Sequence, residues 1–240
     1  MVSIPLSQSG KKNRYLDRYA DGIHISPRRR QKAEILADAL DRLLPDQDGL
    51  EIADFGCADG AVPVLMLHGP IGSRIRRVTG ITLLDYNDLP EKPAHKHKRF
   101  LRMIGDMEES LDHLTLPWGE CDAVTATAFF HYCDHPDIPL AHAARLLKPG
   151  GYLLAGMPAA WVLGLRHHGV PGLLPRNSRI RNIVPLDLYS KLANAFGLRE
   201  VSCQAVQWLG TEWSAAAERT LRRMNFPWCA AQHLVIYQKM

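Results

Sequence analysis

The chain has 240 residues, of which 46% are hydrophobic and 22% charged, and a formal net charge of +4 at pH 7. These values are ordinary for one globular domain or one domain with a lid, and the charge is too small to indicate nucleic-acid binding by itself. No window approaches the roughly 20 apolar residues that span a bilayer, and residues 1–14 lack the apolar region of a secretory signal. The five cysteines are odd in number and scattered, which favours reduced thiols in a cytoplasmic protein.

The N-terminal part predicts an irregular segment followed by a helix and a strand. Residues 1–26 are interpreted as a lid or disordered segment. The helix is expected to begin at Ser26-Pro27, because serine is a good N-cap and proline suits the first helical position. A strand follows at about 50–55, after Pro45 has ended the helix. One helix face is expected to pack on a sheet, since apolar residues recur at helical spacing: Ala33, Ile35, Leu36, Ala39, Leu40, Leu43 and Leu44.

The most informative stretch is residues 52–61, which read Ile-Ala-Asp-Phe-Gly-Cys-Ala-Asp-Gly-Ala. A short apolar strand leads into a turn bounded by Gly56 and Gly60 and then into a helix, which is where an open α/β sheet holds a nucleotide-like ligand. A loop that cradles a pyrophosphate should avoid carboxylates, yet Asp54 and Asp59 flank the glycines. The favoured ligand is therefore adenosine-like but positively charged. S-adenosylmethionine, with its sulfonium and ammonium groups, fits this description.

Two further apolar stretches predict the next strands. Residues 78–84 end in Asp85, where an acid can accept hydrogen bonds from two ribose hydroxyls. Residues 99–104 end in the sequence Gly-Asp-Met at 105–107. The polar stretch 87–98 between them predicts a loop or short helix, which is weaker than the usual crossover helix of a parallel pair.

A fourth strand and a helix follow. Residues 121–126 form a strand that runs into Phe-Phe-His-Tyr at 129–132. Residues 134–147 predict a helix, and the Lys-Pro-Gly-Gly sequence at 148–151 is expected to stop it and turn the chain into a fifth strand at 152–156.

The C-terminal part alternates irregular and regular segments. Residues 158–184 are rich in Gly, Pro and Arg and are expected to be the least regular part of the core. A helix at about 185–196, a strand at about 199–207 and a polar helix at about 211–224 follow. The last strand is expected at 233–239.

This order of elements resembles the class I S-adenosylmethionine-dependent methyltransferases, most clearly from Ile52 to Met157 and more weakly through Met240. The resemblance implies an α/β fold, a Rossmann-like three-layer sandwich around a mostly parallel seven-stranded sheet with an antiparallel last strand. It also implies a methyltransferase domain at 27–240, covered by the lid at 1–26 and by a substrate-cover insertion at 158–184.

The residues at the carboxyl ends of the strands are the expected cofactor site. Gly56 and Gly60 would let the backbone approach the ligand, although a plain strand-to-helix turn also needs such glycines. By resemblance, Asp54 orients the methionine end of S-adenosylmethionine, often through water, and Asp85 binds the ribose. Asp106 would accept from the adenine amino group, with a helix N-cap as the alternative. The remaining expected cofactor contacts are Cys57, Ala58, Tyr86, Met107, Thr125 and Ala126. The family often has glycine where Ala58 stands.

His131 is the candidate catalytic residue. A histidine after the fourth strand can take a proton from an acceptor hydroxyl or hold that hydroxyl in line with the sulfonium. The alternative is a histidine that caps the loop or packs on the adenosine. Histidine, cysteine and aspartate cluster near this position, but their spacing matches no usual zinc pattern, so no metal is expected.

The acceptor site is expected under the two covers. Between Ile138 and Leu186 there is no acidic residue and there are six basic ones, so a locally positive surface would attract an acidic substrate; the alternative is a solvated basic loop. Phe130 is as consistent with core as with pocket wall. The candidate substrate-binding residues are Tyr15, Tyr19, His24, Phe130, Trp161, Arg166, His167 and His168.

The leading function is methyl transfer from S-adenosylmethionine, which leaves S-adenosylhomocysteine, to an oxygen or nitrogen of a small molecule. RNA or protein acceptors are alternatives, but no appended binding domain, long basic run or Asn-Pro-Pro-Tyr sequence supports them. A nicotinamide dehydrogenase is disfavoured by Asp59 and Ala58 in the loop, and a binding module without turnover is disfavoured by the intact motifs. The acceptor and the oligomeric state stay open.

Overall fold

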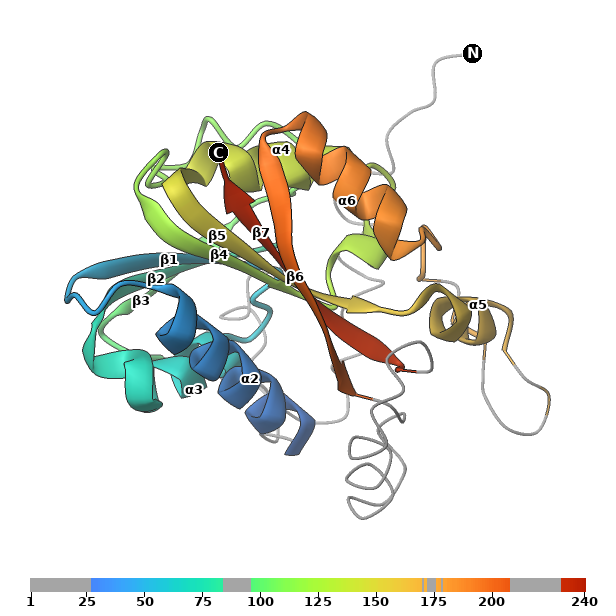
Figure 1. Cartoon of the computed structure of the whole chain (residues 1–240), viewed down its shortest axis with the longest axis horizontal. Coiled ribbons are helices and arrows are strands. Elements are labelled where there is room, and N and C mark those ends of the chain that lie inside the picture. The colour runs from blue at the N-terminus through green and yellow to red at the C-terminus, as the bar shows by residue number, and fades with distance from the viewer. Residues whose placement is uncertain (1–26, 84–95, 170, 172–175, 178, 208–229) are drawn as a thin grey trace.

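The computed structural model describes residues 27–83, 96–169, 171, 176–177, 179–207 and 230–240. A seven-stranded sheet runs through the protein in the order β3-β2-β1-β4-β5-β7-β6 (Figure 1). β1 to β5 pair in parallel, and β7 lies antiparallel between β5 and β6. This confirms the predicted mostly parallel sheet with an antiparallel last strand. The strands are β1 (Leu50–Phe55), β2 (Ile75–Thr82), β3 (Phe100–Ile104), β4 (Cys121–Thr127), β5 (Leu147–Pro158), β6 (Leu198–Gln207) and β7 (Gln232–Lys239).

Helices cover both faces of the sheet and complete the three-layer sandwich (Figure 1). α2 (Pro27–Leu43) and α3 (Ala61–His68) share one hydrophobic cluster with the sheet, and α4 (Asp137–Leu146) and α6 (Leu186–Ala195) share the other. α5 (Ala160–His168) follows β5 and lies beyond the end of the sheet. Short 3-10 turns occupy Pro70–Ser73 (η1) and Phe130–Tyr132 (η3). No helix in the described part of the chain is long and apolar enough to cross a membrane.

β1 is buried along its whole length because helices cover both of its faces. Ile52 packs in the cluster under α2 and α3, whereas Ala53 and Phe55 pack in the cluster under α4 and α6. A strand with two covered faces has a nearly continuous apolar sequence. Side chains alternate along a strand, so Asp54 lies on the face that α2 and α3 cover.

The predicted apolar face of α2 is confirmed. Leu36 and Leu40 are almost fully buried against the sheet, with Ala33, Ala39 and Leu44 beside them. The helix ends at Leu43, just before the expected stop at Pro45.

Several expected boundaries were wrong, and backbone pairing explains the largest error. The Lys-Pro-Gly-Gly sequence at 148–151 lies inside β5 and does not turn the chain into it. Leu147 already pairs with Cys121, and a register shift between Cys121 and Ala123 absorbs the irregular residues. β2 likewise begins at Ile75 and not at Val78, because its first residues pair with the start of β1.

The segment 158–184 is more regular than expected, since it contains α5. Only Leu163 of that helix is buried, so the helix contributes little to the core. The polar helix expected at 211–224 lies outside the described residues. The division into a lid, a domain and a cover insertion stays a prediction.

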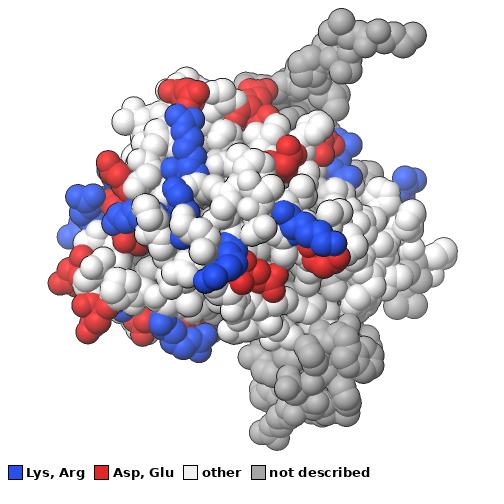
Figure 2. Space-filling model, turned by 45° about the horizontal axis from the view of Figure 1, so that its top comes forward, with Lys and Arg blue, Asp and Glu red and all other residues white. Residues whose placement is uncertain are grey.

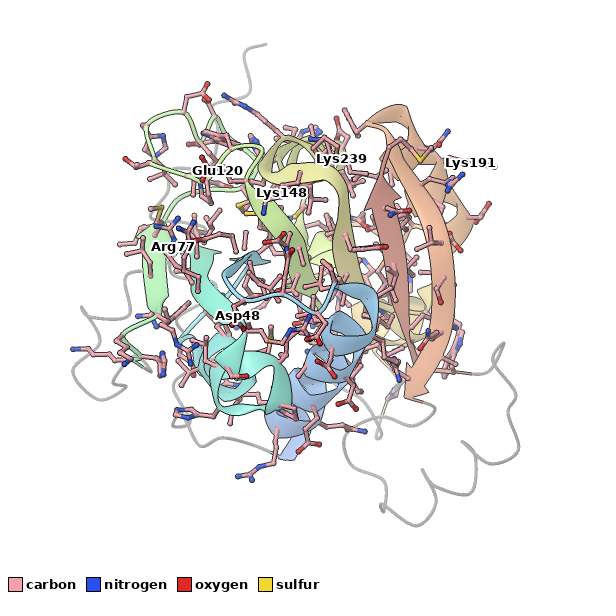
Figure 3. The ribbon with its side chains drawn as sticks, turned by 60° about the vertical axis from the view of Figure 1, so that its left-hand side comes forward. Asp48, Arg77, Glu120, Lys148, Lys191 and Lys239 are labelled. Atoms are coloured by element: carbon pink, nitrogen blue, oxygen red, sulfur yellow. The ribbon has the colours of Figure 1, made fainter. Side chains whose placement is uncertain are left out.

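Buried acids fasten the amino ends of the strands together. The carboxylate of Glu51 in β1 is 3% exposed and accepts hydrogen bonds from Arg76 Nε at 2.6 Å and Arg77 Nε at 3.1 Å. In β4, Asp122 accepts from the Glu51 amide at 2.8 Å and from Lys148 Nζ at 2.8 Å. Arg77 and Lys148 lie at the end of the sheet where the parallel strands begin (Figure 3). Asp54 and the glycine loop lie at the opposite end, where these strands finish.

Two glycine substitutions should have opposite effects on the free energy of unfolding. A Cβ at Gly80 would lie 2.7 Å from Cys57 Sγ and from Phe100 Cε2, so Gly80→Ala should destabilise the protein by about 1–3 kcal/mol through overpacking. A Cβ at Gly164, inside α5, meets nothing within 4 Å, so Gly164→Ala should stabilise by up to about 1 kcal/mol. Urea denaturation measures both. An unchanged stability of Gly80→Ala would contradict the packing between β2 and β3.

Candidate functional site

The loop between β1 and α3 needs its two glycines for conformation and for packing. Gly56 has φ +69° and Gly60 has φ +83°, a region that disfavours other residues. A Cβ at Gly56 would lie 2.7 Å from Phe129 Cδ2, and one at Gly60 would lie 2.4 Å from Phe100 Cε1. The loop is therefore pressed from two sides by aromatic rings of β3 and of the segment after β4.

Ala58 also has a left-handed backbone, with φ +52°. This conformation costs a residue that carries a Cβ roughly 1 kcal/mol. The cost explains why glycine is favourable at this position, and the loop conformation persists here with alanine. Beside it, Cys57 is buried, and burial raises the pKa of its thiol well above the ordinary value.

Asp54 is the buried acid of the site. It is 4% exposed at the end of β1, and Thr125, its partner in register on β4, donates its hydroxyl to Oδ1 at 2.6 Å. Burial raises the pKa of Asp54 to about 7, although the Thr125 hydrogen bond and the nearby charge of Lys32 oppose the rise. The carboxyl group therefore changes its ionisation near neutral pH, and a cationic ligand would stabilise its ionised form.

Asp59, the second acid of the loop, has a different role. Its Oδ2 accepts from Arg29 Nη1 of α2 at 2.6 Å, and its Oδ1 accepts from the Ala61 amide at 3.2 Å. Arg102 of β3 donates to its carbonyl oxygen at 2.6 Å. Because Arg29 neutralises this carboxylate, the expectation that two acids repel a phosphate here holds only for Asp54. The loop is fastened from α2 and from β3.

The expected adenosine residues are only partly described. Asp85 and Tyr86 lie outside the described residues. Asp106 follows β3, is 8% exposed, and accepts from the Glu108 amide on Oδ1 at 3.0 Å. It caps a turn and not a helix, so the alternative of a helix N-cap is not what the structure has, and the contact with adenine stays a prediction. Met107 is 4% exposed and packs in the cluster under α4 and α6.

Thr125 and Ala126 lie inside the sheet, both 0% exposed. Thr125 acts on Asp54, as described above, and Ala126 packs under α4 and α6. Their roles toward a ligand stay predictions.

His131 lies in the 3-10 turn after β4 and is buried, at 5% exposed. Its ring stacks on Tyr132 with 4.0 Å between ring centroids. Its carbonyl oxygen accepts from the Arg181 amide at 2.9 Å, which ties the turn to the segment between α5 and α6. The turn is thus held by the segment that was expected to cover the substrate.

Asn182 is the residue that fastens this turn, and sequence reasoning missed it. Its Nδ2 donates to the carbonyl oxygens of Phe130 at 2.8 Å and of Cys133 at 2.7 Å. Tyr189 of α6 donates its hydroxyl to Asn182 Oδ1. Because Asn182 lies 52 residues after Phe130, no local pattern could have indicated that it holds this turn.

The candidate substrate residues are not brought together. Tyr15, Tyr19 and His24 lie outside the described residues. Phe130 is 2% exposed in the core. Trp161 is 49% exposed on α5, and Arg166, His167 and His168 lie at the end of that helix, beyond the sheet (Figure 1).

Three of the six basic residues between Ile138 and Leu186 form ion pairs with acids that lie outside this span. Arg145 pairs with Asp112 at 2.6 Å, Lys148 with Asp122 at 2.8 Å, and Arg181 with Asp134 at 3.7 Å. Figure 2 shows positive and negative side chains interspersed on the face in view. The alternative interpretation of solvated basic residues applies to these three.

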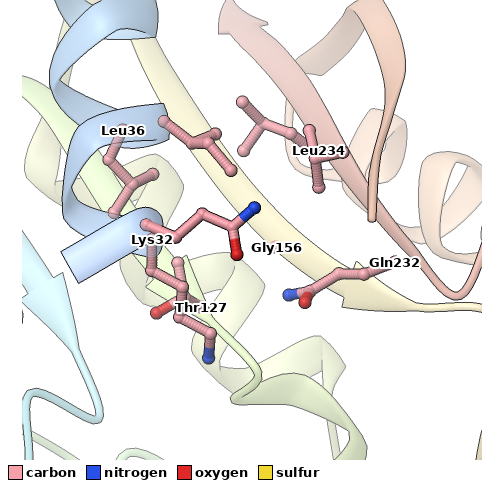
Figure 4. Close-up of a pocket in the computed structure, with 9 residues that line it drawn as sticks. Lys32, Leu36, Thr127, Gly156, Gln232 and Leu234 are labelled. Carbon is pink, nitrogen blue, oxygen red and sulfur yellow. The ribbon is translucent and has the colours of Figure 1, made fainter. Parts of the chain in front are cut away.

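A small open hollow lies between α2 and the β5–β7 pair, and sequence reasoning missed it (Figure 4). Its walls combine apolar and polar side chains from four elements. Six of the lining residues are Lys32, Leu36, Thr127, Gly156, Gln232 and Leu234.

The described residues contain no group of three histidines, cysteines or acids that could hold a metal ion.

Comparisons with known proteins agree with this geometry. The methyltransferase domain family matches residues 28–203. The 27-O-demethylrifamycin SV methyltransferase of Amycolatopsis mediterranei is 27% identical over 199 residues, which are 77% of this chain and 67% of that protein.

Two solved structures share the fold at low sequence identity. An S-adenosylmethionine-dependent methyltransferase from Mesorhizobium loti superposes with a TM-score of 0.57 at 16% identity, over 84% of this chain and 96% of that one. A chain from the complex between the Haloferax volcanii Trm112 methyltransferase activator and a protein described as a methyltransferase superposes with a TM-score of 0.63 at 17% identity, over 98% and 99%.

The buried acid should make the free energy of unfolding depend on pH. The pKa of Asp54 is about 7 in the folded protein and about 3.9 in an unfolded chain, so the folded state binds more protons between these values. The stabilisation is complete below about pH 4 and is lost as the pH rises through 7. Asp54→Asn keeps an acceptor for Thr125 and cannot ionise, so the fall in stability from pH 5 to pH 8 should shrink by on the order of 2 kcal/mol.

Urea denaturation at the two pH values measures this difference. Asp48→Asn, at an exposed aspartate, is the matched control and should leave the fall unchanged. If the free energy of unfolding falls equally from pH 5 to pH 8 in the parent protein and in Asp54→Asn, the carboxyl group is not neutral in the folded state at pH 5.

Proposed function

Because the chain belongs to the methyltransferase domain family and is a class I S-adenosylmethionine-dependent methyltransferase, we propose that it methylates an oxygen or nitrogen of an acidic small molecule in the cytoplasm. The observation that carries the proposal is the buried carboxyl group of Asp54 beside the glycine loop. It is desolvated, and among the described residues its hydrogen-bond partner is a neutral hydroxyl. A phosphate would meet a like charge there, whereas the ammonium group of S-adenosylmethionine would favour the ionised acid.

The site residues fit this cofactor in the order in which the sheet places them. Asp54 would hold the methionine end, and Gly56, Gly60 and the amino end of α3 would let the backbone approach its carboxylate. Asp106 and Met107 would contact the adenine, and Asp85 and Tyr86 the ribose. Cys57, Ala58, Thr125 and Ala126 would form the floor between them. The roles of Asp54, Asp85 and Asp106 are those that the resemblance to the family implies.

Catalysis by the chain would consist mainly of positioning. S-adenosylmethionine supplies a methyl carbon that its sulfonium has already activated. The protein has to hold the acceptor atom in line with that carbon and to exclude water. For a hydroxyl acceptor, His131 would remove the proton or orient the hydroxyl. The carbonyl oxygen of His131 and the Asn182 amide fix the turn that carries the imidazole.

A small-molecule acceptor is supported by the relatives and by the charge distribution. The relative from Amycolatopsis mediterranei carries the name of an O-methyltransferase for a small molecule. Three of the six basic residues between Ile138 and Leu186 pair with acids, which interrupts the positive surface that this span would otherwise form. RNA or a protein side chain stays the second candidate acceptor. Retention on heparin and co-purifying RNA would favour that candidate.

Binding of S-adenosylhomocysteine should raise the melting temperature and release protons. The product binds only the folded state, and its ammonium group should lower the pKa of Asp54 from about 7, so about one proton should leave near pH 6. Calorimetry in two buffers of different ionisation enthalpy measures the release. Asp54→Asn should bind more weakly and release no proton. A thermal shift without any proton release would remove Asp54 from the cofactor site.

Replacing His131 tests the proposed base. With a hydroxyl acceptor, identified by a new O-methyl signal in the NMR spectrum of the product, His131→Gln should lower kcat by about 10²–10⁴-fold and leave S-adenosylhomocysteine affinity unchanged. His113→Gln, at an exposed histidine, is the control. With an amine acceptor that loses its proton to water, the loss should stay below about 10-fold. Full activity of His131→Gln on a hydroxyl acceptor would exclude the imidazole as the base.

A further inference from the structure

The first turn of α2 breaks a rule of helix electrostatics. The helix begins Pro-Arg-Arg-Arg at 27–30 and has no acid in this turn, although the positive end of the helix dipole disfavours cations there. Such a violation is expected where side chains serve contacts outside their own helix. The structure shows one of these contacts. Arg29 reaches the glycine loop and donates from Nη1 to Asp59 Oδ2 at 2.6 Å.

The glycine loop uses several of its own amides. Those of Gly56 and Cys57 both donate to the carbonyl oxygen of Ile81, at 2.9 Å and 3.2 Å. The Gly60 amide donates to the carbonyl oxygen of Cys57 at 2.9 Å. Each of these three amides is therefore engaged inside the protein, so the loop backbone has lost much of its capacity to bind an anion.

The amino end of α3 is occupied as well. A helix start usually presents up to four unpaired amides, which can bind an anion. Here Asp59 Oδ1 accepts from the Ala61 amide at 3.2 Å, so an acid of the protein already takes the place of an anion. Pro63 follows two residues later and has no N–H to donate. A ligand carboxylate at this loop therefore needs a further donor, and a positively charged side chain supplies the strongest kind.

Cations of α2 act on both acids of the loop. Arg29 pairs with Asp59, and the charge of Lys32 acts on the carboxyl group of Asp54. Residues three apart lie on the same face of a helix, so one face of α2 is directed at the loop. α2 and α3 pack in the same cluster on one side of the sheet (Figure 1). Arg29 is therefore close to the expected position of the methionine end of the cofactor.

Arg29 is able to bind Asp59 and a ligand at the same time. A guanidinium carries five N–H donors in a planar fork that matches a carboxylate. The Asp59 side chain is 3% exposed, whereas 23% of the Arg29 side chain is exposed to solvent. The ion pair thus fixes the guanidinium beside the loop while part of the side chain stays accessible. A side chain that is already positioned loses less conformational entropy when a ligand binds.

We propose that Arg29 binds the carboxylate at the methionine end of S-adenosylmethionine, and that Asp59 is the positioning residue that holds the guanidinium in place. Asp54 would bind the ammonium group of the same moiety, so α2 and β1 would read its two opposite charges. The inference rests on the proposed methyltransferase function and deepens it, because it assigns recognition of the carboxylate to a side chain of α2 and not to the loop backbone alone.

Two ligands that differ only in the carboxylate test the inference. S-adenosylhomocysteine carries the carboxylate, and decarboxylated S-adenosylhomocysteine keeps the adenosine and the ammonium group. Calorimetry on the full chain should show that the parent protein prefers S-adenosylhomocysteine by at least about 10-fold, as expected for hydrogen bonds to a charged group. This preference reports on the carboxylate, because a general distortion of the loop weakens the binding of both ligands.

Two variants that differ only at Arg29 isolate its contribution. Arg29→Gln alone would leave the buried carboxylate of Asp59 unpaired, which can unfold the protein and would itself repel the ligand. Asp59→Asn removes that charge, keeps an oxygen that accepts from Arg29, and should retain the preference. The double variant Asp59→Asn/Arg29→Gln should lower the preference by at least about 10-fold relative to Asp59→Asn. Arg30→Gln, the same change at the exposed neighbouring arginine, should leave the preference within about 2-fold of the parent value.

An equal preference in Asp59→Asn and in the double variant would overturn the inference, since a role of Arg29 that is confined to holding the loop predicts that result. A parent protein that binds both ligands equally would overturn it too. If S-adenosylhomocysteine does not bind the parent protein, the proposed methyltransferase function fails together with the inference. If it binds while the preference does not depend on Arg29, the methyltransferase function stands and Arg29 does not bind the carboxylate.

Discussion

The hydrogen bond from Thr125 to the buried carboxyl group of Asp54 joins β1 to β4, and the rest of the site depends on it. In the strand order β3-β2-β1-β4-β5, the direction of the crossovers reverses between these two strands. At such a point, the helices that follow the strands leave in opposite directions and open a crevice at the carboxyl ends. Burial raises the pKa of this carboxyl group although the hydrogen bond from Thr125 opposes the rise, so its ionisation is sensitive to the charge of whatever occupies the crevice.

Two sets of contacts hold the loops on either side of this crevice. On one side, Arg29 and Arg102 bind Asp59 and fix the glycine loop to α2 and β3. On the other side, Asn182 binds two carbonyl oxygens of the turn around His131. Both contacts come from segments remote in sequence, so the loop geometry is preorganised by the folded protein. Catalysis that relies on positioning requires such rigidity.

The distribution of charge changes what an acidic substrate would meet. A span without acids predicts a positive surface, yet Asp122 of β4 and the loop residues Asp112 and Asp134 pair with half of its basic residues. Lys32 on α2 lines a partly apolar hollow, and its charge acts on the carboxyl group of Asp54. A charge beside apolar walls is screened less by water than a charge on the surface.

The sequence by itself determined the sheet, the glycine loop and the family. Local patterns suffice for these: continuous apolar runs indicate strands covered on both faces, and the backbone at Gly56 and Gly60 restricts which residues fit. Only the tertiary structure decided which acids are free to act on a ligand, because Arg29, 30 residues before Asp59, neutralises that acid and leaves Asp54 without such a partner. It also decided that Asn182 holds the His131 turn. The reason is physical, since hydrogen bonds and ion pairs depend on distances of about 3 Å between atoms, and sequence periodicity specifies faces of elements but not such distances across them.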